Sequence, residues 1–315
     1  MSILAKIVWG QPPSAVQSSG AQQASITLLP MPSSESKPAA GLYLVATPIG
    51  NLEDITLRAL RILKEADLIA CEDTRQSQKL LNHFGITTRT TSYHEHNEAA
   101  KAQELVAELE RGRRIALVTD AGMPGISDPG YRVVALAVER GIPVIPIPGA
   151  SAALSALAAS GLPTDAFQFH GFLSAKKGQR RKDLEAVRKS VCTQVFYEAP
   201  HRAIESLQDV VQILGGERKI VLAREITKLH EEFLRGPAAQ VLQTVNERGG
   251  VKGEIVLLIG KAEATEAVVA TVSVGDRVRQ LMVDEKLEEK SALKRAAKER
   301  GISKSEAYRE LQQTK

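Results

Sequence analysis

The sequence contains neither of the two glycine patterns that most often mark a nucleotide-binding site. No G-x-G-x-x-G fingerprint and no Walker A lysine occur in its 315 residues, which excludes an ordinary Rossmann dinucleotide domain and a P-loop nucleotidase. Cysteine is equally scarce, since Cys71 and Cys192 are the only two and fit no metal-binding spacing. We therefore expect no metal site and a reducing compartment.

Aromatic residues and membrane signals are also scarce. Aromatics make up 4% of the chain, so the core must be mostly aliphatic, and an apolar content of 43% is typical of a soluble globular protein. No basic region followed by a long apolar core stands at the N-terminus. One uncharged run, residues 141–164, contains four prolines, which favours a strand, a turn and a buried helix over a membrane span. We expect a cytoplasmic protein with no membrane partner.

The hydrophobic pattern divides the chain into four parts. Residues 1–40 are rich in Gln, Ser, Ala and Pro and lack periodicity past Trp9, which predicts a disordered leader. Residues 41–162 alternate short apolar runs with helical patterns, which predicts a parallel, doubly wound α/β domain. In residues 163–262 paired strands have fewer crossover helices, which predicts a second α/β domain with a mixed sheet. Residues 275–315 are helical throughout, and the break at 301–303 resembles a helix-turn-helix corner capped by Ser303 or Ser305.

One loop stands out within the first domain, at residues 117–131. An apolar run ends at Val118, a segment with three glycines and two prolines follows, and a helical pattern begins at Tyr131. Unusual loops also follow the other predicted strands, at residues 47–51, 72–75, 148–151, 198–202 and 224–228. Because the carboxyl ends of parallel strands meet at one edge of a sheet, we expect a ligand site there. Each loop alone could also be ordinary turn chemistry.

Charge is concentrated locally, since the net charge is only +4. The run 176–182 places five cations in seven residues. It could be a solvated helix face, or a flexible loop that binds phosphate groups of RNA. The carboxylates that follow strands, among them Asp73, Asp120 and Asp128, lack His or Cys at metal-binding spacing. Hydrogen-bonding or ribose-binding roles suit them better than metal ligation.

Long strings of this sequence resemble the tetrapyrrole methylase superfamily. These strings are residues 44–56, 72–75, 117–131, 148–152, 197–202 and 224–228. They are most similar to the branch that methylates the ribose 2′-oxygen of a cytidine, cytidine 1402, in 16S rRNA. The resemblance implies two α/β domains with S-adenosylmethionine (SAM) in the cleft between them, a homodimer, and 16S rRNA within the 30S subunit as partner.

The resemblance also implies roles for individual residues. By match to the family's cofactor loops, SAM contacts fall on Thr47, Pro48, Gly122, Pro124, Ser127, Asp128, Ala150 and Ser151, with Phe172 lining the cleft. A ribose 2′-hydroxyl is a poor acid, so a general base would help; the candidates are Glu72, Asp73 and Glu225. Candidate RNA contacts are Arg75, Lys176, Lys177, Arg180, Arg181, Arg202, Arg224 and Lys228.

Two other functions fit parts of the same sequence. The first is a methyltransferase that acts on a tetrapyrrole of the precorrin or uroporphyrinogen type; the basic run 176–182 and the helical tail count against it, because such a substrate needs neither. The second is a non-catalytic RNA-binding protein that merely retains the fold. Failure to bind SAM would favour this second alternative.

Overall fold

The computed structural model describes residues 38–262, 273–285, 287–300 and 302–313. Residues 1–37 of the predicted disordered leader, and Gly301 of the predicted helix-turn-helix corner, lie outside these ranges. The domain limits at 162/163 and 262/275 stay predictions. Each sheet and the C-terminal helices are described separately below.

The first sheet is entirely parallel. Its strands are β1 (Gly41–Val45), β2 (Leu68–Cys71), β3 (Thr90–Ser92), β4 (Arg114–Val118) and β5 (Val144–Ile147), in the spatial order β3-β2-β4-β1-β5. The helices that connect them are α1 (Leu57–Glu65), α2 (Thr74–His83), α3 (Glu98–Glu110) and α4 (Tyr131–Glu139), with a 3-10 turn η1 at Leu52–Asp54. This confirms the prediction of a doubly wound parallel sheet.

Alternation along the strands places helices on both faces of the first sheet. Tyr43 and Val45 of β1 are buried in the cluster that includes α1 and α2, whereas Leu42 is buried with α3 and α4. Successive strand residues point to opposite faces, so a parallel sheet covered on both sides must be apolar at nearly every position. The Thr56 hydroxyl accepts the Ala59 N–H at 3.1 Å and caps α1.

The second sheet is mixed, as predicted. Its strands are β6 (Phe167–Phe172), β7 (Thr193–Glu198), β8 (Lys219–Arg224), β9 (Glu232–Pro237) and β10 (Ile255–Ile259), in the order β6-β7-β10-β8-β9. Only β6 and β7 pair in parallel. The helices are α5 (Ala152–Ser160), α6 (Lys177–Val187), α7 (Ala203–Leu214) and α8 (Ala238–Glu247), with a 3-10 turn η2 at Pro200–Arg202.

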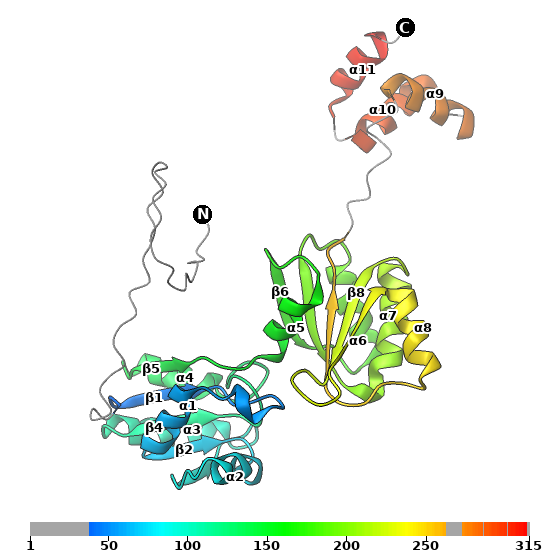
Figure 1. Ribbon diagram of the computed structural model, residues 1–315. Helices are drawn as coiled ribbons and strands as arrows, with labels where there is room; N and C mark the ends of the chain where they lie inside the picture. The colour runs from blue at the N-terminus through cyan, green and yellow to red at the C-terminus, as the bar shows by residue number, and fades with distance from the viewer. Residues whose placement is uncertain (1–37, 263–272, 286, 301, 314–315) are drawn as a thin grey trace, which may run out of the picture. The chain divides into compact units, whose positions relative to one another are not determined.

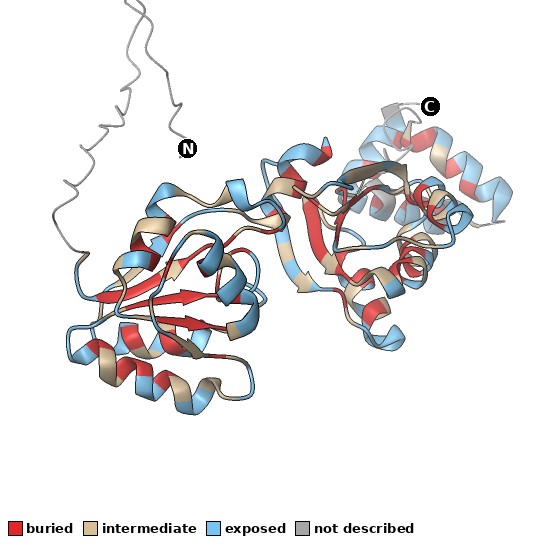
Figure 2. Cartoon of the chain, turned by 60° about the horizontal axis from the view of Figure 1, so that its bottom comes forward, coloured by how far each residue is buried: buried red, intermediate tan, exposed pale blue. Residues whose placement is uncertain are grey.

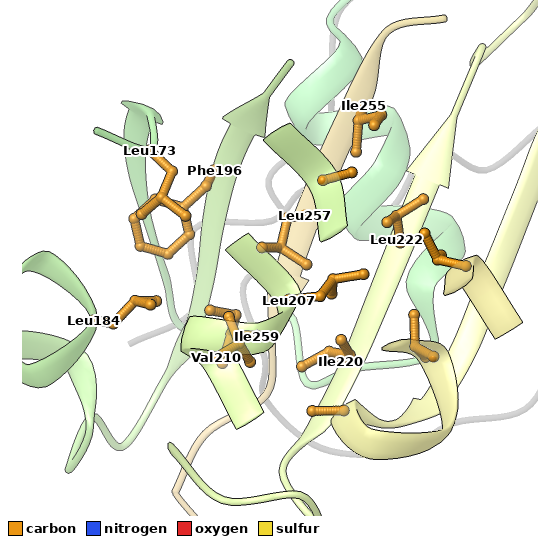
Figure 3. Close-up of a cluster of buried hydrophobic side chains, with 14 of the residues drawn as sticks. Leu173, Leu184, Phe196, Leu207, Val210, Ile220, Leu222, Ile255, Leu257 and Ile259 are labelled. Carbon is orange, nitrogen blue, oxygen red and sulfur yellow. The ribbon is translucent and has the colours of Figure 1, made fainter. Parts of the chain in front are cut away.

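Both faces of the second sheet are also covered. On one face Leu207 and Val210 of α7 lie over strand residues such as Leu222 and Leu257, in an aliphatic core with Phe196 at its edge (Figure 3). On the other face α5 packs with Ala156 and Leu157 against Val221 and Leu258. Figure 2 shows the result, with buried residues along the strands and on one side of each covering helix.

The uncharged run 141–164 therefore contains β5 and α5, which agrees with the strand, turn and buried helix expected from its prolines. Among the described residues, no helix is both long enough and apolar enough to cross a membrane.

Three helices form the C-terminal part, α9 (Val274–Asp284), α10 (Glu289–Arg300) and α11 (Lys304–Gln313). They enclose a small core of their own, built from residues such as Val278, Ala296 and Leu311. Ser303 rather than Ser305 caps α11, because the Ser303 hydroxyl accepts the Glu306 N–H at 3.2 Å while the Glu306 carboxylate accepts the Ser303 N–H at 2.9 Å. This reciprocal capping box fixes where α11 begins.

The structure differs from expectation at Arg180, in the basic run 176–182. Its side chain is 1% exposed, and its guanidinium donates to the Asp209 carboxylate of α7 at 2.8 Å. Burial raises the pKa of Asp209, but the hydrogen bonds from Arg181 and Arg180 outweigh it and hold that pKa below its usual value. A buried charge needs such a partner, so this pair ties α6 to α7. Arg180 is therefore withdrawn from the RNA contacts expected of this run.

Candidate functional site

Two backbone hydrogen bonds join the loops that follow β1 and β4. The Thr47 N–H donates to the Gly122 carbonyl at 2.9 Å, and the Gly122 N–H donates back to the Thr47 carbonyl at 3.1 Å. The Thr47 hydroxyl also donates to the Thr119 carbonyl at 3.2 Å. Gly122 has a φ of +81°, a left-handed conformation that glycine adopts without strain. The structure thus brings together two of the predicted cofactor loops.

The loop that follows β5 lies against the same place. A Cβ on Gly149 would stand 2.9 Å from Cβ of Ala46, and a Cβ on Gly122 would stand 3.7 Å from the Ala150 carbonyl oxygen. Ser151 accepts the Leu154 N–H at 3.5 Å and caps α5, as its position after Gly149 suggests. Three loops predicted to contact the cofactor therefore meet at the carboxyl edge of the first sheet.

The end of the loop 120–130 is held by residues that sequence reasoning missed. Gly130 precedes α4 and has no side chain to cap it. The Glu98 carboxylate, 32 positions earlier, accepts the Gly130 N–H at 3.1 Å, and the Tyr93 hydroxyl accepts the Val133 N–H at 3.3 Å. Tyr93 also donates to Glu98 at 3.0 Å. The sequence could not predict a cap from so distant a residue, because known capping patterns involve only residues close to the helix end.

The loop 120–130 approaches β6 and β7 at a place that includes Ser127, Asp128 and Phe172. Ser127 has a φ of +64°, and its hydroxyl oxygen lies 3.1 Å from the position of a Cβ on Gly171. The Phe172 ring, 60% exposed, lies edge-on to Tyr197 with centroids 5.5 Å apart. Burial raises the pKa of the Tyr197 hydroxyl, and the nearby Asp128 charge adds to the rise. Tyr197 is thus a third residue, after Glu98 and Tyr93, to which sequence reasoning assigned no role in this site.

Carboxylates gather at the neighbouring ends of β2 and β4. Burial raises the pKa of Glu72, and the charges of Asp120 and Asp73 add to it. Burial likewise raises the pKa of Asp128 to about 6, with contributions from Glu72 and Asp120. Burial and neighbouring negative charge thus make Glu72 and Asp128 harder to ionise. In the described ranges, no group of His, Cys, Asp or Glu side chains is arranged to hold a metal ion.

The other two candidate bases have cationic or N–H partners. The Asp73 carboxylate caps α2 through the Arg75 N–H at 2.8 Å and also pairs with the Arg75 guanidinium, which lowers the pKa of Asp73. The Glu225 carboxylate accepts the Glu254 N–H and the Lys228 ammonium, both at 3.0 Å. Those two contacts, the N–H first, lower the pKa of Glu225. Both residues are held ionised and oriented.

The cations expected to contact RNA fall into two groups. Arg202 pairs with Glu198 at 2.7 Å, Arg224 with Glu232 at 2.7 Å and Lys228 with Glu225 at 3.0 Å. Arg75 is paired but 88% exposed. Lys176 and Lys177 are exposed at the start of α6 and have no ion-pair partner among the described residues. Of the two prolines predicted to contact SAM, Pro124 is buried in its loop and Pro48 is half-buried.

Asp128→Asn is expected to stabilise the protein at neutral pH. The folded-state pKa of about 6 lies above the ordinary value of 3.8, so the ionised side chain costs stability above pH 6, and this cost disappears as the pH falls toward 4. Discounted for partial exposure, removal of the charge should raise the free energy of unfolding by about 1–2 kcal/mol at pH 7.5.

Urea unfolding at pH 7.5 and at pH 4.5 checks this prediction. At pH 4.5 the gain should fall to about a third of its value at pH 7.5, because the unfolded side chain is still mostly ionised at pH 4.5. Asp165→Asn removes an exposed carboxylate and serves as the control; it should change stability little at either pH. An equal gain at both pH values would show that ionisation of Asp128 does not lower the free energy of unfolding.

Comparison with known proteins gives the family. A family model described as Tetrapyrrole (Corrin/Porphyrin) Methylases matches residues 41–242. A protein named Ribosomal RNA small subunit methyltransferase I, from Halalkalibacterium halodurans, is 50% identical over 271 residues, which cover 85% of this chain and 93% of that protein. Proteins of the same name from Escherichia coli O157:H7 and Bacillus subtilis are 46% and 43% identical; each match covers 85% of this chain and 93% and 92% of those proteins.

Solved structures agree in fold. A diphthine synthase superposes with a TM-score of 0.54 at 14% identity, covering 70% of this chain and 89% of its own. A cobalt precorrin-4 methyltransferase superposes with a TM-score of 0.51 at 17% identity, covering 70% and 94%. From the family model and from relatives that align over most of its length, it follows that this chain belongs to the tetrapyrrole methylase family, with close relatives named Ribosomal RNA small subunit methyltransferase I.

Proposed function

We propose that this protein transfers a methyl group from SAM to the ribose 2′-oxygen of a cytidine, cytidine 1402, in 16S rRNA. The observation that carries the proposal is identity of 43–52% to proteins named Ribosomal RNA small subunit methyltransferase I. Matches to several of them extend over at least 85% of this chain, so the whole described fold is shared rather than one motif.

The charges at the strand ends fit a cationic cofactor. Burial raises the pKa of Glu72, Asp120 and Asp128, and the charge of at least one neighbouring carboxylate adds to each rise. A positive ligand beside them would relieve this repulsion. SAM carries a sulfonium and an ammonium group, and when bound it supplies an electrophilic methyl group. The proposed contacts are the loop residues Thr47, Pro48, Gly122, Pro124, Ser127, Asp128, Ala150 and Ser151, with Phe172. The bridge between Thr47 and Gly122 would hold two of these loops in a fixed geometry.

Among the three candidate bases, the structure favours Glu72. A base for a weakly acidic hydroxyl works best with a pKa close to the working pH. The pKa of Glu72 is raised by burial, whereas those of Asp73 and Glu225 are lowered by their donors. In this proposal Glu72 would accept the proton of the 2′-hydroxyl, and Asp73 and Glu225 would orient neighbouring groups. SAM would supply the methyl group, which exchanges its bond to sulfur for one to the ribose oxygen, and would leave as S-adenosylhomocysteine.

The RNA contacts are proposed for the cations that lie open to solvent. Lys176 and Lys177, which have no ion-pair partner among the described residues, and the exposed Arg75 would contact phosphates. Arg181 was expected in the same role, but its guanidinium pairs with Asp209 at 2.8 Å and would have to leave that partner to bind RNA. Arg202, Arg224 and Lys228 would shape the site through their carboxylate partners. The expected homodimer and the 30S subunit as substrate form part of the same proposal.

Incubation with tritiated SAM tests the reaction directly. Offered 30S subunits, naked 16S rRNA and uroporphyrinogen in parallel, the protein should label 16S rRNA. Nuclease digestion and mass spectrometry should then find the label as 2′-O-methylcytidine. Label in the tetrapyrrole would replace the proposal by the first alternative. RNA binding without SAM binding in calorimetry would replace it by the second.

Glu72→Gln should slow single-turnover methylation by about 10²-fold, because the amide cannot accept the proton. Glu225→Gln is the matched control, since it is isosteric and alters a carboxylate that is already held by Lys228. It should slow the reaction much less. Equal rates for the two variants would remove Glu72 from the role of base.

Lys176→Ala combined with Lys177→Ala should weaken RNA binding and flatten its salt dependence. Loss of two phosphate contacts lowers the slope of log K against log salt by about 1 to 1.5. The control, Lys64→Ala with Lys79→Ala, removes two exposed lysines from α1 and α2. Filter binding between 50 and 300 mM salt measures both, and identical slopes would leave the run 176–182 as a solvated helix face.

A further inference from the structure

Leu229 is the most exposed large apolar side chain among the described residues, at 93%. It lies in the seven-residue loop 225–231, which joins β8 to its antiparallel neighbour β9. A single exposed apolar side chain contributes nothing to folding and is free to contact a ligand; what singles out Leu229 is the loop that carries it.

The loop around Leu229 is fixed in place. Ile226 is 8% exposed and is buried in one cluster with Ile49. The Glu231 carboxylate accepts the Thr227 N–H at 2.7 Å, and the Lys228 ammonium bridges Glu225 at 3.0 Å and Glu254 at 3.2 Å. Leu229 is therefore presented by a rigid support.

The backbone of this loop is strained. Glu225 and Thr227 have φ values of +52° and +67°, a left-handed conformation that residues with a Cβ rarely adopt. Gly253 makes the arrangement possible, because a Cβ there would stand 2.3 Å from the Glu225 carboxylate. Such strain persists where the surrounding contacts over-determine the backbone, and it concentrates at functional sites.

The same loop adjoins one of the loops proposed to contact SAM. A Cβ on Gly50 would stand 2.4 Å from Cγ of Lys228, so the two segments touch at this glycine. Ile49 and Ile226 are buried together, and Thr47, three residues before Gly50, is bonded to Gly122. Leu229 is thus carried by a segment in direct contact with the proposed methyl-transfer site.

We propose that Leu229 is an apolar wedge that packs against a nucleobase beside the methylated cytidine. This inference rests on the proposed function. A target nucleotide that leaves its stack can turn its 2′-oxygen toward the methyl group, and apolar side chains inserted at a base step hold such a gap open. The ammonium group of Lys228, the residue before Leu229, is paired with two carboxylates. Leu229 therefore offers an apolar surface to a base, while the charge beside it is already matched.

Leu229→Ser tests the wedge, with Leu229→Met as the conservative variant and Val191→Ser as the matched control. Val191 is 84% exposed and precedes β7. The pairing of β7 and β8 with β10 places Val191 and Leu229 at opposite ends of these strands. Leu229→Ser should lower kcat/KM for 30S methylation by about tenfold, since most of the buried apolar contact is lost. Leu229→Met and Val191→Ser should stay within about twofold of the unaltered protein. SAM affinity should be unchanged in all three.

A fluorescent readout separates a wedge from other contacts. In a 16S rRNA fragment with 2-aminopurine beside the target cytidine, the unaltered protein should raise the fluorescence as the base unstacks, and Leu229→Ser should not. Methylation by Leu229→Ser at the normal rate, or an undiminished fluorescence rise, would overturn the wedge. A loss confined to 30S subunits would assign Leu229 to a ribosomal protein instead, and a change of oligomeric state would assign it to a second copy of this chain. If the unaltered protein does not methylate rRNA at all, the proposed function fails rather than this inference alone.

Discussion

The hydrogen bonds between Thr47 and Gly122 are the contact on which the candidate site depends. The parallel pairing of β1 with β4 and β5 already sets three strand ends side by side. The bridge extends that pairing beyond the strands, into loops that would otherwise diverge. Gly122 can take part because its left-handed backbone turns the chain at once after the bridge. The proposed cofactor loops are thus held in place by hydrogen bonds that continue the sheet, and they do not move as free surface loops.

The same region contains residues whose charge or backbone conformation lowers the stability of the fold. Asp128 and Glu72 are both harder to ionise than ordinary carboxyls, and Ser127 and Glu225 hold left-handed backbone. Each costs free energy, and the cost is carried by well-packed surroundings such as the Glu98 and Tyr93 cap on α4. Sites that bind or transform ligands commonly retain such strain because binding relieves it. A cationic ligand would do so here.

Local patterns were enough to predict most elements of the fold. The alternation of apolar runs with helical patterns predicted the parallel first sheet, and the paired strands of residues 163–262 predicted the mixed second sheet. The side-chain partners could not be predicted in the same way. Arg180 belongs to a run that looks wholly solvated, yet its charge is neutralised by Asp209, 29 positions away. Glu98 caps a helix 32 positions away. Such pairs depend on how helices pack across a sheet, which no short window of sequence contains.

Under the proposed function, ion pairing divides the candidate RNA-binding cations into two groups with different tasks. Arg202, Arg224 and Lys228 sit at the ends of β7 and β8 and are matched by carboxylates, so close to the candidate site the net positive charge is small. Lys176 and Lys177 remain unmatched at the start of α6. Phosphate attraction acts over a Debye length and needs no exact geometry, whereas positioning a ribose needs short, directional contacts. In the proposed function, unpaired cations at the margin of the site attract the RNA, and ion-paired groups position it. The acidic residues that favour a cationic methyl donor can then lie in the same site without repelling the RNA.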